Sequence, residues 1–208
     1  MKDTKDRIVE EGLELLAKQG FAGVTLGVLA QQTGLSKSGL FAHFGSKSEV
    51  QLRLLEETVE ASKRVVVEPA LLLAPGLRQL RAIFEAWLGW SEKAGLHGGC
   101  ALASGFFELD DAAPDDPVRT RLAAIEGEWR SMLVEVVTAA VDAEELNADV
   151  DVGQFVWEMF GIYLVHHVSH RFVHDPKATN RALTAFDGLV SRSTPVAKVK
   201  RGKSAAGR

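Results

Sequence analysis

The sequence predicts an all-α fold of about nine helices in two lobes. Apolar residues recur at helical spacing along most of the chain, and no stretch of useful length alternates as a strand does. The 208 residues, 46% of them hydrophobic, suffice for one substantial core beside a small headpiece. We expect a headpiece over residues 1–50, a helical body over 51–194 and a basic disordered tail over 195–208.

The headpiece should contain three helices. An amphipathic segment opens the chain, and two short helices follow it across a tight turn. Thr25 is a good N-cap for the first of these and Ser36 for the second, while Gly34 can adopt the positive φ that the turn between them requires. Ser46 and Glu49 form a capping box, so a further helix begins there at once.

The second short helix has the pattern of an element that reads DNA. Leu40 and Phe44 are four residues apart and face inward together. From Leu15 through Ser48 there is no Asp or Glu, although the formal net charge of the chain is -4. An acidic protein that binds the polyanionic duplex must keep carboxylates off its docking face, so this lobe is expected to bind double-stranded DNA. The outward side chains are Lys37, Ser38, Phe41 and Ala42.

Caps, glycines and prolines divide the body into further helices. A long helix should link the lobes and end before Pro69, and a flexible loop at Gly95–Gly99 should close the next helix. Asp116 caps the longest segment and Pro117 opens it. The expected helices are 46–67, 76–93, 100–109, 117–143, 151–173 and 176–190.

The segment 153–173 carries apolar residues in nearly every direction around its axis, which is typical of a helix buried on both sides. A membrane span is improbable, because Glu158 and three histidines interrupt the segment. The face expected to pack on a partner chain holds Phe155, Met159, Ile162 and His166. The face expected to line the interior holds Trp157, Phe160, Leu164 and Val168.

Between residues 4 and 50 the chain reads, in order, a helix, Gly-Phe, Thr, Leu-Ala, Thr-Gly-Leu-Ser, Gly-Leu-aromatic, His-Phe and Ser-Lys. This order resembles the DNA-binding domain of the TetR family of bacterial transcriptional regulators. The family usually has Tyr at the position of Phe41. One polar anchor on a backbone phosphate is therefore lost here, or replaced by apolar contact with a sugar or a thymine methyl.

The resemblance implies DNA contacts for eight residues. Thr25 and Ser36 would also be ordinary N-caps in any helical protein, and Lys47 would often be a solvated charge, so the order and spacing carry the information. The implied set comprises the phosphate contacts Thr25 and Lys47, the base readers Lys37, Ser38 and Gly39, the phosphate or sugar contact His43, and Ser36 and Phe41 beside them.

The resemblance also implies a two-fold homodimer and adds Phe186 and Leu189 of the last helix to the interface. The two reading helices would then lie one turn of DNA apart, roughly 34 Å. The partner of such a dimer is an imperfectly palindromic operator.

A ligand cavity is expected in the body, because aromatic residues concentrate there and helix bundles hold ligands between their helices. For each aromatic residue alone, a place in the core is the simpler interpretation. The expected partner is a small, largely apolar effector that shifts the population of subunit conformations away from DNA, with no cofactor. The candidate ligand-binding residues are Trp87, Trp90, Cys100, Phe106, Trp129, Trp157, Phe160 and Tyr163.

Cys100 is the single cysteine, which excludes an internal disulfide and a four-cysteine zinc site. It should sit near a helix start, where a thiolate is stabilised, so a thiol- or redox-sensing regulator is the alternative function. A buried small residue is the plainer interpretation.

His166 and His170 share a helical face, but no carboxylate or cysteine at short spacing completes a metal site.

Other function classes find little support in the sequence. No nucleophile motif, glycine-rich phosphate loop or catalytic carboxylate pair marks an enzyme. The basic segment from Lys198 would suit a protein that coats DNA, although such tails are more often disordered.

The charged, amphipathic start is unlike a secretory signal, so a cytoplasmic location is expected. Segments 98–100 and 108–111 resemble a recurring C-terminal pattern of these regulators.

Overall fold

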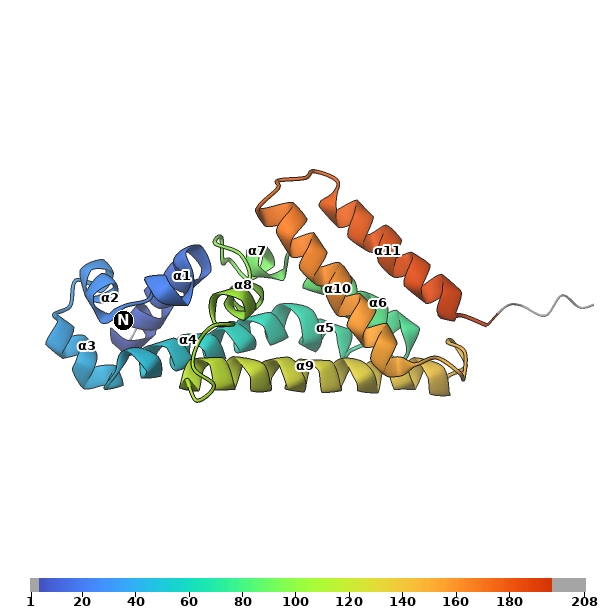
Figure 1. The fold of residues 1–208 in the computed structure, drawn as a ribbon, viewed down its shortest axis with the longest axis horizontal. Coiled ribbons are helices and arrows are strands. Elements are labelled where there is room, and N and C mark those ends of the chain that lie inside the picture. Colours follow the sequence, from blue (N-terminus) through green and yellow to red (C-terminus); the bar gives the residue numbers. More distant parts are fainter. Residues whose placement is uncertain (1–3, 196–208) are drawn as a thin grey trace, which may run out of the picture.

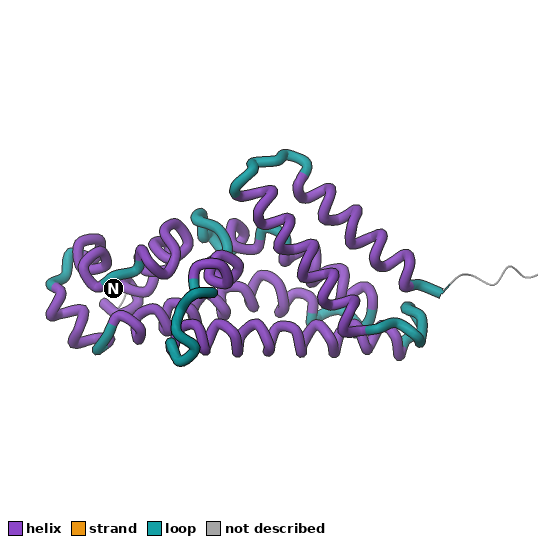
Figure 2. Tube along the Cα trace, in the orientation of Figure 1, coloured by secondary structure: helices purple, strands orange, loops and turns teal. Residues whose placement is uncertain are grey.

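The computed structural model describes residues 4–195, which are helical and contain no strand (Figure 1, Figure 2). Nine α-helices have eight residues or more, which confirms the expected all-α fold. Residues 196–208, and with them nearly all of the expected basic tail, lie outside the described residues. The elements are α1 (Thr4–Gly23), α2 (Leu26–Thr33), α3 (Lys37–Phe44), α4 (Lys47–Ser62), the π-helical turn η1 (Lys63–Val67), α5 (Glu68–Ala70), α6 (Leu77–Trp87), α7 (Trp90–Lys93), α8 (Ala101–Glu108), α9 (Pro117–Asp142), α10 (Val152–Arg171) and α11 (Ala178–Ser193).

The short helices of the headpiece begin at the expected caps. The hydroxyl oxygens of Thr25, Ser36 and Ser46 each accept a hydrogen bond from the backbone N–H three residues on, at 3.2, 3.0 and 3.1 Å respectively. Gly34 ends α2 in the left-handed conformation with φ 68°. These local bonds fix where α2, α3 and α4 start, and thereby how α3 projects from the headpiece.

One hydrophobic cluster joins the headpiece to the body. It takes in apolar side chains of α1 to α4, and it also takes in Ala101 of α8 and Leu122 of α9. Helix α4 runs without a break through residue 50, where the boundary between the lobes was expected, and Val59 near its end still belongs to this cluster. The headpiece therefore packs on the body along a continuous core.

The helix that links the two lobes continues past Pro69, where it was expected to end. After Ser62 the backbone makes the π-helical turn η1, and α5 then carries Pro69 in its first turn. In an α-helix, proline lacks the N–H for the ladder and its ring collides with the carbonyl four residues earlier. A π-helical turn changes that register, so the chain remains helical as far as Ala70.

The helix expected over residues 76–93 is divided in two. Leu88 is extended and Gly89 is left-handed with φ 70°, so α6 ends at Trp87 and α7 starts at Trp90. The loop that follows was expected to be flexible, but it is packed. Gly98 lies so close to Ala17 of α1 that a Cβ at residue 98 would overlap the backbone there.

In the body, α6, α9, α10 and α11 surround a second hydrophobic cluster (Figure 1). Phe84 of α6 stacks on Phe186 of α11, with ring centroids 4.2 Å apart. Helices α10 and α11 lie side by side and antiparallel, joined by a loop at the top of Figure 1. Within residues 4–195, no helix has the length and hydropathy needed to cross a membrane.

Most residues on the two faces of α10 were assigned wrongly from the sequence, although Phe160 is buried in the interior as expected. Five of the six residues expected to contact a partner chain are enclosed by their own subunit, and the sixth, Ile162, is half-buried. Trp157 and Val168, expected in the interior, are exposed. A helix that is apolar on every side gives no periodic signal of which side faces its own core. The enclosed residues are Phe155, Met159, His166, Phe186 and Leu189.

Candidate functional site

Helix α3 presents a surface without carboxylates. Leu40 and Phe44 are buried in the headpiece core as expected, and the Phe41 side chain is 57% exposed. At the edge of the acid-free segment, Glu14 pairs with Lys18 at 2.8 Å. Such a surface suits a polyanionic partner. The exposed residues of α3 are Lys37, Ser38, Phe41, Ala42 and His43, and Gly39 is half-buried among them.

Lys37 and Thr25 come together at the start of α2. The Lys37 side chain crosses Gly27, where an added Cβ would lie 3.2 Å from Lys37 Cε and 3.8 Å from Thr25 Oγ1. The absence of a side chain at Gly27 thus leaves room for the lysine. Lys47 is exposed in the first turn of α4, next to the cap residue Ser46. The predicted DNA contacts from α2, α3 and α4 therefore belong to one end of the headpiece (Figure 1).

A cavity of about 190 Å³ lies in the body between α4, η1, α6, α7, α8, α9 and α10. Its wall is mostly apolar and aromatic, with a few polar residues. The lining residues are Val59, Ser62, Lys63, Val67, Trp87, Trp90, Cys100, Leu102, Ala103, Phe106, Ile125, Glu126, Glu128, Trp129, Met132, Phe160 and Tyr163.

Seven of the eight candidate ligand-binding residues lie in this wall, and Trp157 does not. The Trp157 side chain is 61% exposed on the outer face of α10, so its assignment to the cavity is wrong. Phe160, three residues further along the same helix, faces inward and lines the cavity. The error arises because α10 is apolar on every side and gives no periodic signal of its inward face.

Aromatic rings support one another around the cavity. Trp87 stacks on Tyr163 with ring centroids 4.0 Å apart, and it meets Trp129 edge-on at 5.0 Å. Phe106 and Phe160 lie 6.0 Å apart. These spacings are favourable for aromatic pairs, so the rings stabilise one another and leave the cavity open between them.

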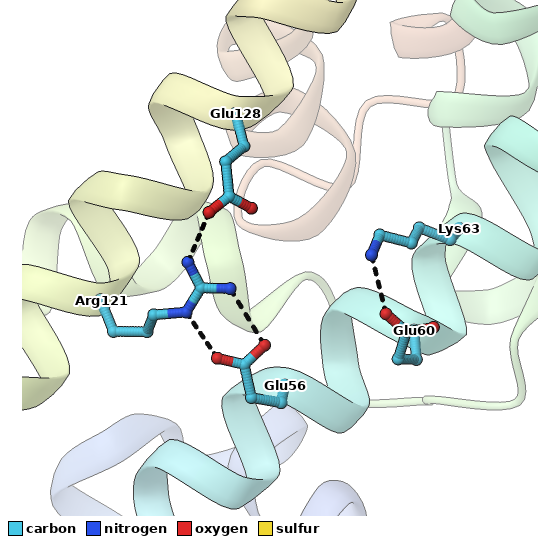
Figure 3. A network of polar contacts seen from close by, with 5 residues as sticks. All are labelled: Glu56, Glu60, Lys63, Arg121 and Glu128. Atoms are coloured by element: carbon cyan, nitrogen blue, oxygen red, sulfur yellow. Dashed lines mark hydrogen bonds and ion pairs between the residues drawn. The ribbon is translucent and has the colours of Figure 1, made fainter.

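A charged network links α4 to α9 beside the cavity (Figure 3). Nε and Nη2 of Arg121 donate to the two carboxylate oxygens of Glu56 at 2.5 and 3.1 Å, and Nη1 donates to Glu128 at 2.7 Å. The hydrogen bond from Arg121 lowers the pKa of Glu56, against an opposing effect of burial. Nearby, Lys63 donates to Glu60 at 2.8 Å.

Cys100 lies at the N-cap of α8, as expected, but its surroundings disfavour a thiolate. Its sulfur accepts a hydrogen bond from the N–H of Ala103 at 3.3 Å, and the side chain is buried. Burial raises the pKa of the Cys100 thiol, against smaller opposing effects of its hydrogen bonds. A sensor thiol needs a lowered pKa and exposure, so the thiol- or redox-sensing alternative is unsupported.

Two histidines of α10, His166 and His170, make polar contacts with neighbouring helices. His166 Nε2 lies 3.2 Å from Thr179 Oγ1, and His170 Nε2 lies 3.3 Å from a carboxylate oxygen of Glu92. Burial, with the charges of neighbouring histidines, lowers the pKa of His166 to about 4, so it is neutral at neutral pH. In the part of the chain that the structure describes, no group of three or more His, Cys, Asp or Glu side chains is placed to hold a metal ion.

Helix α8 ties the headpiece to the cavity. The Glu108 carboxylate accepts hydrogen bonds from the backbone N–H groups of Phe21 and Ala22 at 2.9 and 2.5 Å. These two N–H groups follow Gly20, where non-helical φ and ψ values interrupt α1. Another side of α8 faces the cavity through Ala103 and Phe106.

Two family models match the chain. Residues 8–54 match the bacterial regulatory proteins of the tetR family, and residues 76–186 match the tetracyclin repressor-like C-terminal domain. The chain belongs to the TetR family. It is therefore a DNA-binding transcriptional regulator and not an enzyme, as the motif in residues 4–50 indicated.

One curated relative matches a short part of the chain. YerO of Bacillus subtilis (strain 168), described as an uncharacterized HTH-type transcriptional regulator, is 38% identical over 56 residues, which are 27% of this chain and 19% of that protein. The match thus spans about a fifth of the relative's length.

Three solved structures share the fold at low sequence identity. A regulator from Cytophaga hutchinsonii has a TM-score of 0.80 at 19% identity, covering 94% of this chain and 99% of its own. One from Chloroflexus aurantiacus J-10-FL has a TM-score of 0.77 at 22% identity, covering 90% and 92%. AibR, solved in complex with isovaleryl coenzyme A and operator DNA, has a TM-score of 0.68 at 17% identity, covering 93% and 99%.

Apart from Trp129, the cavity residues of α4, η1 and α9 were not predicted from the sequence. Ile125, Trp129 and Met132 stand at positions i, i+4 and i+7, a spacing that indicates one helical face. Lys63 and Val67 had no comparable signal, because they lie on a π-helical turn that no sequence pattern predicted. Glu108 was noted only as part of a recurring pattern.

The Glu56–Arg121 ion pair should stabilise the fold at neutral pH and lose this effect in acid. The folded-state pKa of Glu56 is lowered, so its contribution is present above the unfolded value of 4.5 and disappears as pH falls through the folded value. Both side chains are partly exposed, which limits the coupling energy to about 1 kcal/mol. A double-mutant cycle with Glu56→Gln and Arg121→Gln, followed by urea unfolding at about pH 7 and about pH 3.5, measures it.

The exposed Glu60–Lys63 pair provides the control, because a single hydrogen bond between two exposed side chains should give a coupling energy near zero at both pH values. A Glu56–Arg121 coupling energy that is equal at both pH values would contradict the assignment.

Proposed function

We propose that this protein is a ligand-responsive repressor that leaves a palindromic operator when a small, largely apolar effector fills the cavity. The observation that carries the proposal is the double role of α8, which lines the cavity through Phe106 and binds the headpiece through Glu108. A ligand that shifts α8 in the cavity wall also shifts the headpiece, because the two are bonded to each other. DNA affinity then falls by the factor that couples the two sites.

The chemistry of the effector follows from the cavity wall, which is apolar and aromatic and so favours apolar ligands. AibR, the structural neighbour noted above, has been captured with a small-molecule thioester and operator DNA together. That complex supports a fold that binds a small molecule at one site and DNA at another. A chromosome-binding regulator acts where the chromosome is, so we place the protein in the cytoplasm.

We assign operator contact to the exposed residues of α3 and to the caps and lysines beside them. Lys37 and Ser38 begin α3, where side chains of a recognition helix reach base edges. Thr25 and Lys47 lie at the starts of α2 and α4, where helix N-terminal N–H groups favour phosphate. A footprint on DNA upstream of the protein's own gene, repeated at raised salt, tests specific binding.

Lys37→Ala should weaken operator binding by about 1–3 kcal/mol and relax the sequence preference, because a base contact is lost. Lys47→Ala should weaken all DNA about equally and reduce the salt slope by about one, because a phosphate contact is lost. Anisotropy titrations of operator and scrambled duplexes at several salt concentrations measure both effects. Equal changes in specificity for the two variants would refute the division of roles.

Glu108→Ala should uncouple effector from DNA. The variant loses the carboxylate that holds the N–H groups of Phe21 and Ala22, so the movement of α8 no longer reaches the headpiece. The best cavity ligand from a thermal-shift screen of apolar compounds should still bind, but its effect on operator affinity should shrink toward none.

Asp111→Ala is the matched control for this measurement. It removes an equal charge in the loop after α8, where Asp111 donates its N–H to Asp110 and no bond to α1 is formed by its side chain. The control should keep the full effect of the ligand on operator affinity. If Glu108→Ala keeps that effect as well, α8 does not transmit it through this carboxylate.

We also propose a homodimer through the outer face of α10. Trp157, Val165, Val168 and Phe172 form an exposed apolar stripe at helical spacing. Gly161 lies in the same stripe, and a Cβ there would meet no atom of its own subunit within 4 Å. A second copy covering this face would bury the stripe and hold two α3 helices at a fixed separation.

Val165→Glu should raise the dimer dissociation constant by about tenfold or more, since it buries a carboxylate in the contact. The Val165 side chain is 67% exposed in the subunit, so the substitution should leave the fold intact. Leu72→Glu is the control, because Leu72 is 88% exposed but belongs to the turn after α5 and not to the α10 stripe. Sedimentation velocity measures the distribution of species. A wild-type monomer at micromolar concentration would rule out the proposed dimer.

A further inference from the structure

Gly27 stands in the first turn of α2, where the backbone does not require a glycine. Its φ is not positive, so other residues can adopt the same conformation. Glycine destabilises a helix relative to alanine, because it loses more conformational freedom on folding. A glycine at this position therefore needs a reason outside its own backbone.

The atoms nearest to Gly27 belong to two residues that we assign to operator contact. Apart from the adjoining chain, a Cβ at residue 27 would lie closest to Lys37, at 3.2 Å from Cε and 3.5 Å from Nζ, and then to Thr25 Oγ1 at 3.8 Å. At Gly105, by contrast, a Cβ would meet two side chains of the headpiece core. The missing side chain at Gly27 thus makes room on the DNA-binding end of the headpiece and not in its core.

Lys37 brings its charge to this place from the neighbouring helix. It is the first residue of α3, and the end of its side chain lies over the first turn of α2 (Figure 1). Among the residues that the structure describes, no carboxylate pairs with its ammonium group. The lysine is therefore held by contact along the α2 backbone and keeps its charge available, since the residue is exposed.

We propose that Gly27 is a positioning residue for Lys37 in operator recognition. Because residue 27 has no side chain, the stem of the lysine can lie on α2, and its ammonium group then approaches the bases from a defined direction. A side chain that is already ordered loses less conformational entropy when it binds. This inference rests on the proposed role of Lys37 as a base reader.

A side chain added at residue 27 should displace the lysine in proportion to its size. A methyl group would be 3.2 Å from Lys37 Cε, so the exposed lysine has to move by a few tenths of an ångström. Thr25 Oγ1, at 3.8 Å, is at an ordinary contact distance and can stay in place. The two γ-methyl groups of valine would extend further into the space that the lysine occupies.

The test measures operator affinity and sequence preference for full-length Gly27→Ala and Gly27→Val. Anisotropy titrations on the footprinted operator should show binding weakened about twofold by alanine and about fivefold to tenfold by valine. The preference for operator over a scrambled duplex should fall in parallel, as it does for Lys37→Ala. Thermal unfolding of Gly27→Ala should show no loss of stability, since alanine favours the helix.

A double-mutant cycle with Lys37→Ala establishes whether the effect acts through the lysine. In the Lys37→Ala background, Gly27→Val should change operator affinity by less than about twofold. A loss of equal size with and without the lysine would overturn the proposal, because valine would then obstruct the DNA itself.

Gly127 provides the matched control. It is also a helical glycine without a positive φ, it is exposed on α9, and a Cβ there would meet no atom within 4 Å. Gly127→Ala and Gly127→Val should leave operator affinity and sequence preference unchanged. Circular dichroism establishes that all variants are folded, and Gly27→Ala carries the test if valine destabilises the headpiece.

The outcomes separate this inference from the proposed function. If Lys37→Ala weakens operator binding and Gly27→Val does not, the positioning role of Gly27 is wrong and the role of Lys37 stands. If Lys37→Ala changes neither affinity nor sequence preference, the proposed role of Lys37 fails, and the positioning role of Gly27 fails with it.

Discussion

Helix α8 packs tightly on the headpiece while it also lines the cavity. At Gly105, a Cβ would come within 2.8 Å of the Phe21 ring and 2.9 Å of a Leu122 methyl, so the helix has no space on that side. Glu108 at its end holds the backbone of Phe21 and Ala22. Because the helix has only eight residues, a displacement at the cavity is also a displacement at the headpiece. This constraint is the physical route that the proposed response to an effector would use.

The cavity depends on rings that support one another and on an irregular stretch of backbone. Trp87 contacts both Tyr163 and Trp129, and these large side chains hold the wall apart instead of filling the space. The π-helical turn η1 contributes Lys63 and Val67 to the same wall. Pro69 accounts for the turn, since an α-helix in that register would clash with its ring. The shape of the cavity therefore depends in part on one proline that does not line it.

The polar groups of the body fall into two kinds. Arg121, His166 and His170 have partners that fix helices against one another. Trp129 lines the cavity, and its indole N–H is buried without a partner. Cys100 belongs to the structural group, because burial keeps its thiol protonated and its sulfur caps α8. Burial therefore gives Cys100 a structural role, and its place at the start of α8 does not make the thiol reactive.

The sequence by itself determined the features that depend on neighbours along the chain. The caps at Thr25, Ser36 and Ser46 and the turn at Gly34 involve a few consecutive residues, so the headpiece helices and the family could be recognised from them. Tertiary structure alone decided the outward face of α10, the contact of Glu108 with α1, and the unpartnered N–H of Trp129. Each of these depends on which distant segment packs alongside, and no periodicity within a single helix records that choice.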